Sequence, residues 1–431
     1  MKKNILLALL CGAFVFACSD ESNGLKAQDK KPESSSSETA GVDYTLGRTM
    51  NARLGKGINL GNAWDGNSYW DCGTLDDGDS FTYTNLNGET KSIVLGKSES
   101  SYFGNLPAQR YNFGCDDKLD GGWGNAIKDD YFAFLKAAGF NSIRLPVRWQ
   151  HNSDPVTHKV NPERLAGVMD DVQKAINAGL IVIISFHWYY EINFAANHAS
   201  TNPDLYEAEK VHFASIWNEV ASAFEVFPDS MLVWDILNEP TMIKPEHLNE
   251  VMTLGYNTIR AVAPGKTIMF ESYQAAKFEA LEVLNLPKDG NIIYSGHYYE
   301  PYEFSHQGHQ PQYKCIGDAA YANDSKSHLL TYVKQAKQLY PDINGSDYVP
   351  LNMGEFGISG GTEKAKRSFC KSGEPLPSAM MKAKWATKTI EAAELYGISW
   401  HYWGFVGVGG FEAYDKNNSV WYEGFPAAFG L

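Results

Sequence analysis

Two glutamates stand at the ends of apolar runs that are typical of β-strands. Glu239 ends the run "LVWDILNE" (232–239) and is followed by Pro240, while Glu355 lies in "VPLNMGEF" (349–356). Proline cannot donate a hydrogen bond to a strand, and an ionised carboxylate is costly to bury unless it is paired, hydrogen-bonded or used in chemistry. These strand ends are therefore where a reaction is expected.

The arrangement of apolar runs predicts how such strand ends come together. Runs typical of strands cover residues 57–61, 142–147, 181–188, 232–239, 267–272, 291–299, 349–356 and 398–405. Amphipathic segments between them predict helices near 127–138, 162–178, 207–226, 246–262, 325–340 and 377–396. Eight strand and helix units predict a (β/α)8 TIM barrel, whose catalytic groups lie at the carboxyl ends of the strands. An open doubly wound sheet is the alternative, but "GINLGNAW" lacks the GxGxxG spacing of its phosphate loop.

Polar and aromatic residues gather at the expected strand ends and should meet on one rim of the barrel. They are Asn62, Arg144, His187, Trp188, Asn238, Glu239, Glu271, His297, Tyr299, Glu355 and Trp403. Two carboxylates among hydrogen-bond donors and aromatic walls suit hydrolysis of a glycosidic bond, in which one carboxyl group donates a proton and the other attacks the anomeric carbon. Glu271 is expected to be a buried, hydrogen-bonded acid near the rim rather than a catalytic group.

Six motifs in order carry a resemblance to a known family. "LGKGINLGNAWDG", "FNSIRLPVRW", "WDILNEP", "GHYYEP", "NMGEFGIS" and "SWHYWGF" together resemble glycoside hydrolase family 5, the β/α-barrel endoglucanases and related β-glycanases, over roughly residues 54–405. The resemblance implies that Glu239 is the general acid and base and Glu355 the nucleophile. It also implies a double displacement that retains anomeric configuration, with the two carboxyl groups ~5 to 5.5 Å apart.

The same resemblance implies a set of substrate-binding residues. They are Arg144, His187, Asn238, His297, Tyr299 and Trp403. Arg144 is expected to lie beside Glu355 and to favour its ionised form, and Tyr299 to hydrogen-bond the same carboxylate. Trp403 is expected to form the floor beneath the sugar, because a sugar ring has an apolar face that an aromatic side chain can cover.

The substrate implied by the resemblance is a β-1,4-glucan, such as cellulose, cut at internal bonds. Mannan and xyloglucan are alternatives on the same scaffold, and a non-catalytic surface glycan-binding lipoprotein is an alternative of another class. The formal charge of -14 argues against nucleic-acid binding. No metal or cofactor is expected, because the acidic loops "TLDDGDS" and "DDKLDGG" lack EF-hand spacing. A monomer is expected.

The amino terminus has the pattern of an exported protein. Lys2 and Lys3 precede an apolar stretch at residues 4–17, which is too short to span a membrane. "VFAC" before Cys18 resembles a lipoprotein cleavage and lipidation site. The expected organisation is a signal peptide at 1–17, a flexible Ser-rich tether at 18–43 and a catalytic domain at 44–431. The protein is therefore expected in the bacterial cell envelope, with a lipid as its sole membrane anchor, or secreted.

Four further cysteines suit disulfides in an exported protein: Cys72, Cys115, Cys315 and Cys370. Three pairings are possible. Cys72 with Cys115 and Cys315 with Cys370 are preferred, because each pair would tie together loops on one face. The first pair would close a long insertion at residues 63–121, which is expected to form a wall of the cleft and to shape its sugar-binding subsites.

Overall fold

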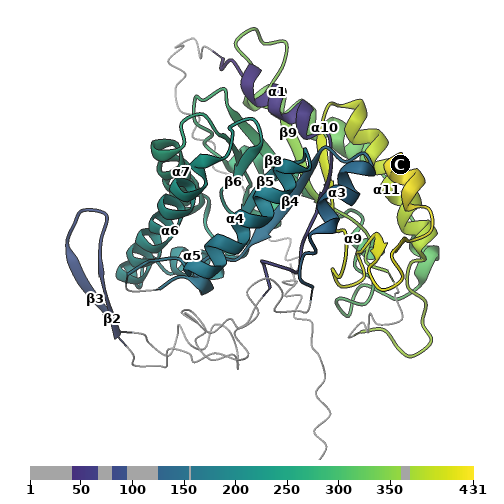
Figure 1. The fold of residues 1–431 in the computed structure, drawn as a ribbon, viewed down its shortest axis with the longest axis horizontal. Helices are drawn as coiled ribbons and strands as arrows, with labels where there is room; N and C mark the ends of the chain where they lie inside the picture. The colour runs from purple at the N-terminus through teal and green to yellow at the C-terminus, as the bar shows by residue number, and fades with distance from the viewer. Residues whose placement is uncertain (1–40, 67–79, 95–124, 155–156, 361–368) are drawn as a thin grey trace, which may run out of the picture.

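Eight parallel strands close into a barrel, as the sequence predicts (Figure 1). The structure is a computed structural model that describes residues 41–66, 80–94, 125–154, 157–360 and 369–431. Around the barrel the strands run in the order β1 (Lys56–Asn59), β10 (Ser399–Tyr402), β9 (Leu351–Phe356), β8 (Ile292–Tyr298), β7 (Thr267–Phe270), β6 (Leu232–Asp235), β5 (Ile181–Phe186) and β4 (Ser142–Val147). Pairing of β1 with both β4 and β10 completes the closure.

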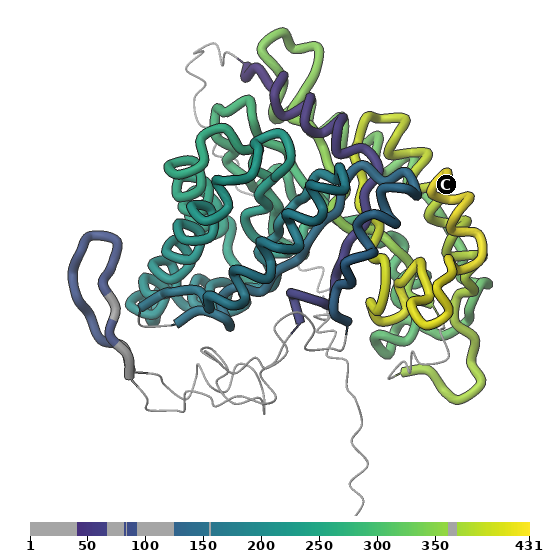
Figure 2. Tube along the Cα trace, viewed as in Figure 1, coloured from purple at the N-terminus to yellow at the C-terminus, as the bar shows by residue number. Residues whose placement is uncertain are grey.

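Helices surround the barrel on its outer side (Figure 2). Six of them match the predicted segments: α3 (Asp130–Ala137), α4 (Pro162–Asn177), α6 (Pro203–Ala223), α7 (Pro245–Val262), α10 (Ser325–Leu339) and α11 (Ala379–Leu395). The start of α4 illustrates the local cause, because Asn161 accepts hydrogen bonds from the first-turn amides and Pro162 occupies the first position.

Shorter elements fill the connections, and the sequence patterns did not predict them. The additional helices are α1 (Thr45–Leu54), α5 (Tyr190–Asn197), α8 (Tyr273–Ala276), α9 (Tyr302–Ser305) and α12 (Phe425–Phe429). Short 3-10 helices are η1 (Gln150–Asn152), η2 (Phe224–Val226), η3 (Phe278–Val283) and η4 (Gly317–Ala320). Two small hairpins pair β2 (Ser80–Thr84) with β3 (Thr90–Val94) and β11 (Tyr414–Asp415) with β12 (Val420–Trp421).

Helix α1 closes the amino-terminal end of the barrel, and Figure 1 shows it lying across that end. Its Met50 and Leu54 form one apolar cluster with Ile183, Val233 and Met269, which project inward from three strands. The lower layer of the barrel interior is therefore a packed core. Chemistry must take place in a layer nearer the carboxyl ends of the strands.

The upper interior layer is polar. Side chains of a strand alternate between its two faces, so the residues two positions beyond the inward-facing apolar ones also face inward. Two positions beyond Val233 and Met269 stand Asp235 and Glu271, both fully buried. The same period of two that builds the lower core thus delivers carboxylates to the upper layer.

The larger described part of the insertion is the β2–β3 hairpin, which lies against the first turns of α6. The Leu86 amide approaches Glu207 at 3.4 Å, and Lys91 pairs with Asp204 at 3.7 Å. The rest of residues 63–121 is largely outside the described residues, as are Cys72 and Cys115. The predicted role of the insertion as a cleft wall therefore stays a prediction.

His401 on β10 is a neutral histidine built into the barrel interior. Its Nδ1 accepts a hydrogen bond from the Asn352 amide at 3.2 Å, and its Nε2 lies 2.9 Å from the Ser142 hydroxyl, which itself donates to the Leu54 carbonyl. A Cβ at Gly57 would collide with the imidazole ring, so glycine makes room for it. Burial, and then the charge of Arg144, lowers the pKa of His401 to about 3.

This histidine should make stability depend on pH. An unfolded histidine takes up a proton below about 6.5, while His401 in the folded protein stays neutral down to about 3. Its contribution is therefore complete above pH 6.5 and is lost progressively as the pH falls through that window. In His401→Gln, the decrease in melting temperature between pH 7 and pH 4.5 should be smaller than in the wild type. Equal decreases in calorimetric scans would contradict this.

Candidate active site

A fully buried arginine organises the upper layer of the barrel. Arg144 on β4 donates from Nη1 to Glu355 Oε1 at 2.7 Å. From Nη2 it reaches Asp235 Oδ2 at 3.0 Å and Glu271 Oε1 at 3.2 Å. Burial alone would lower the pKa of Arg144, but the three carboxylates outweigh it and raise that pKa, so the guanidinium stays charged. With His297 and Glu239 these residues form what we call the charged cluster.

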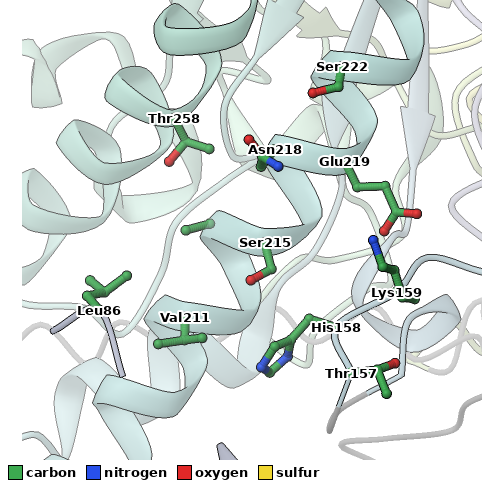
Figure 3. Close-up of a pocket in the computed structure, with 11 residues that line it drawn as sticks. Leu86, Thr157, His158, Lys159, Val211, Ser215, Asn218, Glu219, Ser222 and Thr258 are labelled. Carbon is green, nitrogen blue, oxygen red and sulfur yellow. The ribbon is translucent and has the colours of Figure 1, made fainter. Parts of the chain in front are cut away.

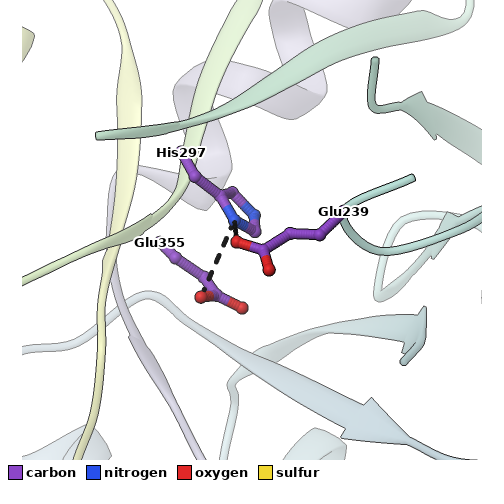
Figure 4. A group of neighbouring side chains, drawn as sticks. All are labelled: Glu239, His297 and Glu355. Carbon is purple, nitrogen blue, oxygen red and sulfur yellow. Dashed lines mark hydrogen bonds and ion pairs between the residues drawn. The ribbon is translucent and has the colours of Figure 1, made fainter. Parts of the chain in front are cut away.

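The two predicted catalytic glutamates lie close together, and both approach the same ring nitrogen of His297 (Figure 4). His297 Nδ1 lies 2.7 Å from Glu239 Oε1 and 3.7 Å from Glu355 Oε2. One carboxylate oxygen of each glutamate and one ring nitrogen all lie within 4.8 Å of one another. This upper limit on the distance between the nearest oxygens is compatible with the ~5 to 5.5 Å of a retaining pair and lies below the ~6.5 to 9.5 Å of an inverting pair.

Glu239 does not end its strand, because β6 stops at Asp235 and Glu239 lies in the loop beyond it. Its backbone has φ of 47°, in the left-handed region that non-glycine residues seldom adopt. The Glu239 side chain is about one-quarter exposed, at 25%, whereas that of Glu355 on β9 is 6% exposed. Of the two, Glu239 is the one open to solvent.

The protonation of Glu355 reflects opposing effects. Burial raises the pKa of Glu355 to about 7, while the charges of His297 and Arg144 act to lower it. Arg144 thus acts in the predicted direction, but burial outweighs it. The Tyr299 hydroxyl donates to Glu355 Oε2 at 2.8 Å, the contact expected from the sequence. Together these donors fix both oxygens of the carboxylate.

His297 bridges carboxylates on both sides of its ring. Its Nδ1 lies 2.7 Å from Glu239 and its Nε2 3.1 Å from Glu271. Burial alone would lower the pKa of His297, but the charges of Glu271 and Glu355 raise it well above the usual value. The ring is therefore an imidazolium that donates from both nitrogens. The triad of Glu239, His297 and Glu355 has spacing that could accept a metal ion, but an ion would have to replace one of these protons.

Asn238 and His187 present polar atoms without partners among the described residues. Asn238 Oδ1 accepts from Arg144 at 2.5 Å, and its buried Nδ2 has no hydrogen-bond partner in the part of the chain that the structure describes. The same holds for both ring nitrogens of His187, although Asp65 lies 3.8 Å away. Buried polar groups of this kind are costly unless a ligand or water satisfies them.

An aromatic surface borders the two glutamates. Trp403 lies just past β10, and its indole is parallel to the His187 ring, with centroids 5.8 Å apart and an interplanar angle of 2°. A Cβ at Gly61 would collide with the indole, so glycine allows this placement. Trp403 also clusters with Tyr299 and Phe411. All of the predicted substrate-binding residues thus lie around one site.

Sequence reasoning underestimated two acids, Asp235 and Glu271. Asp235 was not singled out, and Glu271 was expected only as a buried rim acid. The structure places both against Arg144, and Glu271 also against His297. Burial and the charge of Glu271 raise the pKa of Asp235 to about 7. The signal that could have found Asp235 is the period of two along β6, four residues before Glu239.

A disulfide ties two loops at this end of the barrel. Cys315, in the loop after β8, is bonded to Cys370, in the loop after β9. This is one of the two pairings preferred from the sequence; the other involves residues outside those described. The bond joins positions 55 residues apart, and cross-linking them restricts the unfolded chain.

A separate hollow of about 600 Å³ lies beside α6 (Figure 3). Its wall includes Ser215 and Glu219 on α6, Lys159 from the turn before α4, and Leu86 from the hairpin. None of its described lining residues belongs to the charged cluster.

The helices that the structure describes include none that is long and apolar enough to cross a membrane.

Comparisons with known proteins agree with the geometry. The profile of the family described as Cellulase (glycosyl hydrolase family 5) matches residues 105–407. Endoglucanase H of Acetivibrio thermocellus is 24% identical over 58% of this chain and 25% of its own length. A xyloglucan-specific endo-β-1,4-glucanase of Bacteroides ovatus is 27% identical over 50% of this chain and 46% of its own. The chain thus spans less than half the length of these two relatives.

A solved structure is similar over nearly the whole fold. The crystal structure of a hyperthermophilic endo-β-1,4-glucanase in complex with substrate has a TM-score of 0.63 and 26% identity to this chain. The match covers 90% of this chain and 100% of that one. The barrel is therefore shared along its full length.

The charged cluster makes a prediction about stability. Arg144→Met would leave Glu355, Asp235 and Glu271 buried without their common cation, and we expect a loss of about 3–5 kcal/mol in the free energy of unfolding at pH 8. The loss should shrink at pH 5.5, because Glu355 and Asp235, whose pKa values are already about 7, can then take up protons. Urea unfolding at both pH values measures it, and a loss independent of pH would contradict the assignment.

Proposed function

Since this chain belongs to glycosyl hydrolase family 5, the cellulase family, we propose that it hydrolyses internal bonds of β-1,4-glucan with retention of configuration. The observation that carries the proposal is that a carboxylate oxygen of Glu239 and one of Glu355 lie within 4.8 Å of each other, beside the same nitrogen of a protonated histidine. Two carboxyl groups at this distance have room for a covalent sugar intermediate and not for an intervening water.

In the first step, the carboxyl group of Glu239 gives its proton to the glycosidic oxygen. The Glu355 carboxylate attacks the anomeric carbon, the bond to the leaving sugar breaks, and that sugar departs as an alcohol. Glu239 suits the role of acid because it is the more exposed of the two and can reach the leaving oxygen. Glu355 suits the role of nucleophile because Arg144 and Tyr299 hold its oxygens.

In the second step, the Glu239 carboxylate takes a proton from water, which attacks the anomeric carbon. The bond between sugar and Glu355 breaks, and both carboxyl groups return to their starting states. His297 Nδ1 lies 2.7 Å from Glu239 Oε1. This contact holds the carboxyl group of Glu239 in place beside Glu355.

Neighbouring groups provide the sugar contacts. The Asn238 amide, with its unpartnered Nδ2 beside Glu239, suits a sugar hydroxyl that must be held during bond breaking. The stacked Trp403 and His187 offer an apolar surface with ring nitrogens at its edge. This combination suits a sugar ring, which has an apolar face and a polar rim.

Glucan is the substrate we favour, because endoglucanases recur among the relatives. Xyloglucan is a second candidate, since one relative is a xyloglucan-specific endo-β-1,4-glucanase. Both share a β-1,4-linked glucan backbone, so the charged cluster does not distinguish them. Loops farther from the two glutamates would have to distinguish xyloglucan from unsubstituted glucan.

The catalytic assignment predicts the effect of two substitutions. Glu355→Gln should lower kcat on barley β-glucan by at least about 10⁴-fold, because it removes the nucleophile. Glu239→Gln should lower it by about 10²- to 10⁴-fold, because it removes proton transfer. Reducing-end release from carboxymethylcellulose, xyloglucan and mannan by the wild type identifies the backbone. Binding without release by the wild type would favour a non-catalytic glycan-binding protein, and full activity in Glu355→Gln would refute the nucleophile.

We also propose that the protein is exported and anchored to the cell envelope through a lipid on Cys18. The support is the sequence pattern of Lys2, Lys3, the apolar stretch at 4–17 and "VFAC". The proposed tether at 18–43 would let the barrel reach an insoluble polymer.

Lipidation can be measured in cells. With a bacterial host expressing the full chain and fed labelled palmitate, the wild type should carry label and sediment with membranes. Cys18→Ala should lose the label and appear in the soluble fraction. Equal labelling of both proteins would contradict lipidation at Cys18.

A further inference from the structure

Glu271 accepts hydrogen bonds from three different parts of the charged cluster. It lies one residue past β7 and is fully buried. Its Oε2 accepts from the backbone amide of Glu239 at 2.8 Å. Its Oε1 accepts from Arg144 Nη2 at 3.2 Å and from His297 Nε2 at 3.1 Å. Glu271 therefore contacts the main chain of Glu239 directly. It also contacts Arg144, which hydrogen-bonds Glu355, and His297, which hydrogen-bonds Glu239.

The contact with the Glu239 amide is made at a residue with an unfavourable backbone conformation. Glu239 has φ of 47°, a conformation that is unfavourable for a residue with a Cβ. A hydrogen bond between an amide and a charged carboxylate is stronger than one between neutral groups. Glu271 therefore holds the peptide from which the Glu239 side chain projects.

A second connection reaches the carboxyl group of Glu239. His297 donates to Glu239 Oε1 at 2.7 Å, and its opposite nitrogen is held by Glu271. Glu271 therefore helps to fix the orientation of the imidazolium that contacts Glu239. Glu271 thus holds the main chain of Glu239 by a direct hydrogen bond and holds its side chain indirectly, through His297.

We propose that Glu271 is a positioning residue that fixes the general acid Glu239 in line with Glu355. The inference deepens the proposed function and rests on it. Glu271 itself does not touch the reacting atoms, because its oxygens are occupied by Arg144, His297 and the Glu239 amide.

A carboxylate is required at this position because every neighbour is a donor. Glutamine has one acceptor oxygen and one NH₂ donor, so in Glu271→Gln the NH₂ would face either the Glu239 amide or the pair formed by Arg144 and His297. Either the hydrogen bond to the Glu239 amide or the hydrogen bond to His297 would be lost. Arg144 would remain held by Asp235, at 3.3 Å from Nε and 3.0 Å from Nη2. The nucleophile should therefore be affected less than the acid.

The test compares two substrates that differ in their need for a proton. Barley β-glucan has a poor leaving group that must be protonated, whereas 2,4-dinitrophenyl β-cellobioside has a leaving group that departs unaided. In Glu271→Gln, kcat on the glucan should fall by at least about 10²-fold, and the first-step rate on the activated glycoside by less than about tenfold. The matched control is Glu209→Gln, which removes another buried glutamate, on α6, that accepts from Tyr189. It should show no difference between the two substrates.

A double-mutant cycle separates positioning from a structural role. If Glu271 acts through Glu239, Glu271→Gln should reduce glucan hydrolysis much less in a Glu239→Gln background than in the wild type. Equal losses in both backgrounds, or equal losses on both substrates, would overturn the inference. A wild type inactive on both substrates would overturn the proposed function instead. If thermal melting shows that Glu271→Gln is unfolded, the test uses Glu271→Asp instead. Aspartate keeps the negative charge but has a shorter side chain. The same difference between the two substrates is then required.

Discussion

The charge of Arg144 is the constraint on which the site depends. An arginine with no exposed surface must be surrounded by acceptors, and here Glu355, Glu271 and Asp235 supply them. In return, those carboxylates can remain in the interior without all being neutralised. A second cation, the imidazolium of His297, extends the arrangement to Glu239. Glu239 and Glu355, the proposed catalytic pair, therefore belong to a larger set of charges that compensate one another.

The barrel delivers these charges through a simple alternation. Along β6 and β7, Val233 and Met269 join the apolar layer that α1 closes, and two residues later Asp235 and Glu271 face the same interior. The apolar layer excludes water from below, which strengthens the electrostatic interactions above it. Rigid strands hold Arg144 and Glu355, while Glu239 stands on a loop. Glu239, the proposed acid, is therefore the group whose position needs extra support.

Much of this arrangement could be predicted from the sequence, and the rest depends on tertiary contacts. The eight strands were predictable because buried parallel strands are continuous apolar runs. The helix α1 was not, because "TLGRTMNARL" shows only a short apolar pattern and is stabilised by packing under the barrel. Glu239 was expected to end its strand, but no local pattern reveals a left-handed residue in the loop beyond. The hydrogen bonds of Glu271 reach Arg144, Glu239 and His297, which lie on three segments distant in the chain. Local sequence patterns do not reveal contacts of this kind.

Covalent trapping tests the central claim, that Glu355 forms the bond to carbon. The protein is incubated with 2,4-dinitrophenyl 2-deoxy-2-fluoro-β-cellobioside, whose fluorine slows breakdown of a glycosyl-enzyme intermediate, and is then digested and analysed by mass spectrometry. The account predicts loss of activity with one fluorosugar per chain, attached to the peptide that contains Glu355. Attachment to Glu239 or another residue, or glucan hydrolysis that inverts the anomeric configuration, would contradict it.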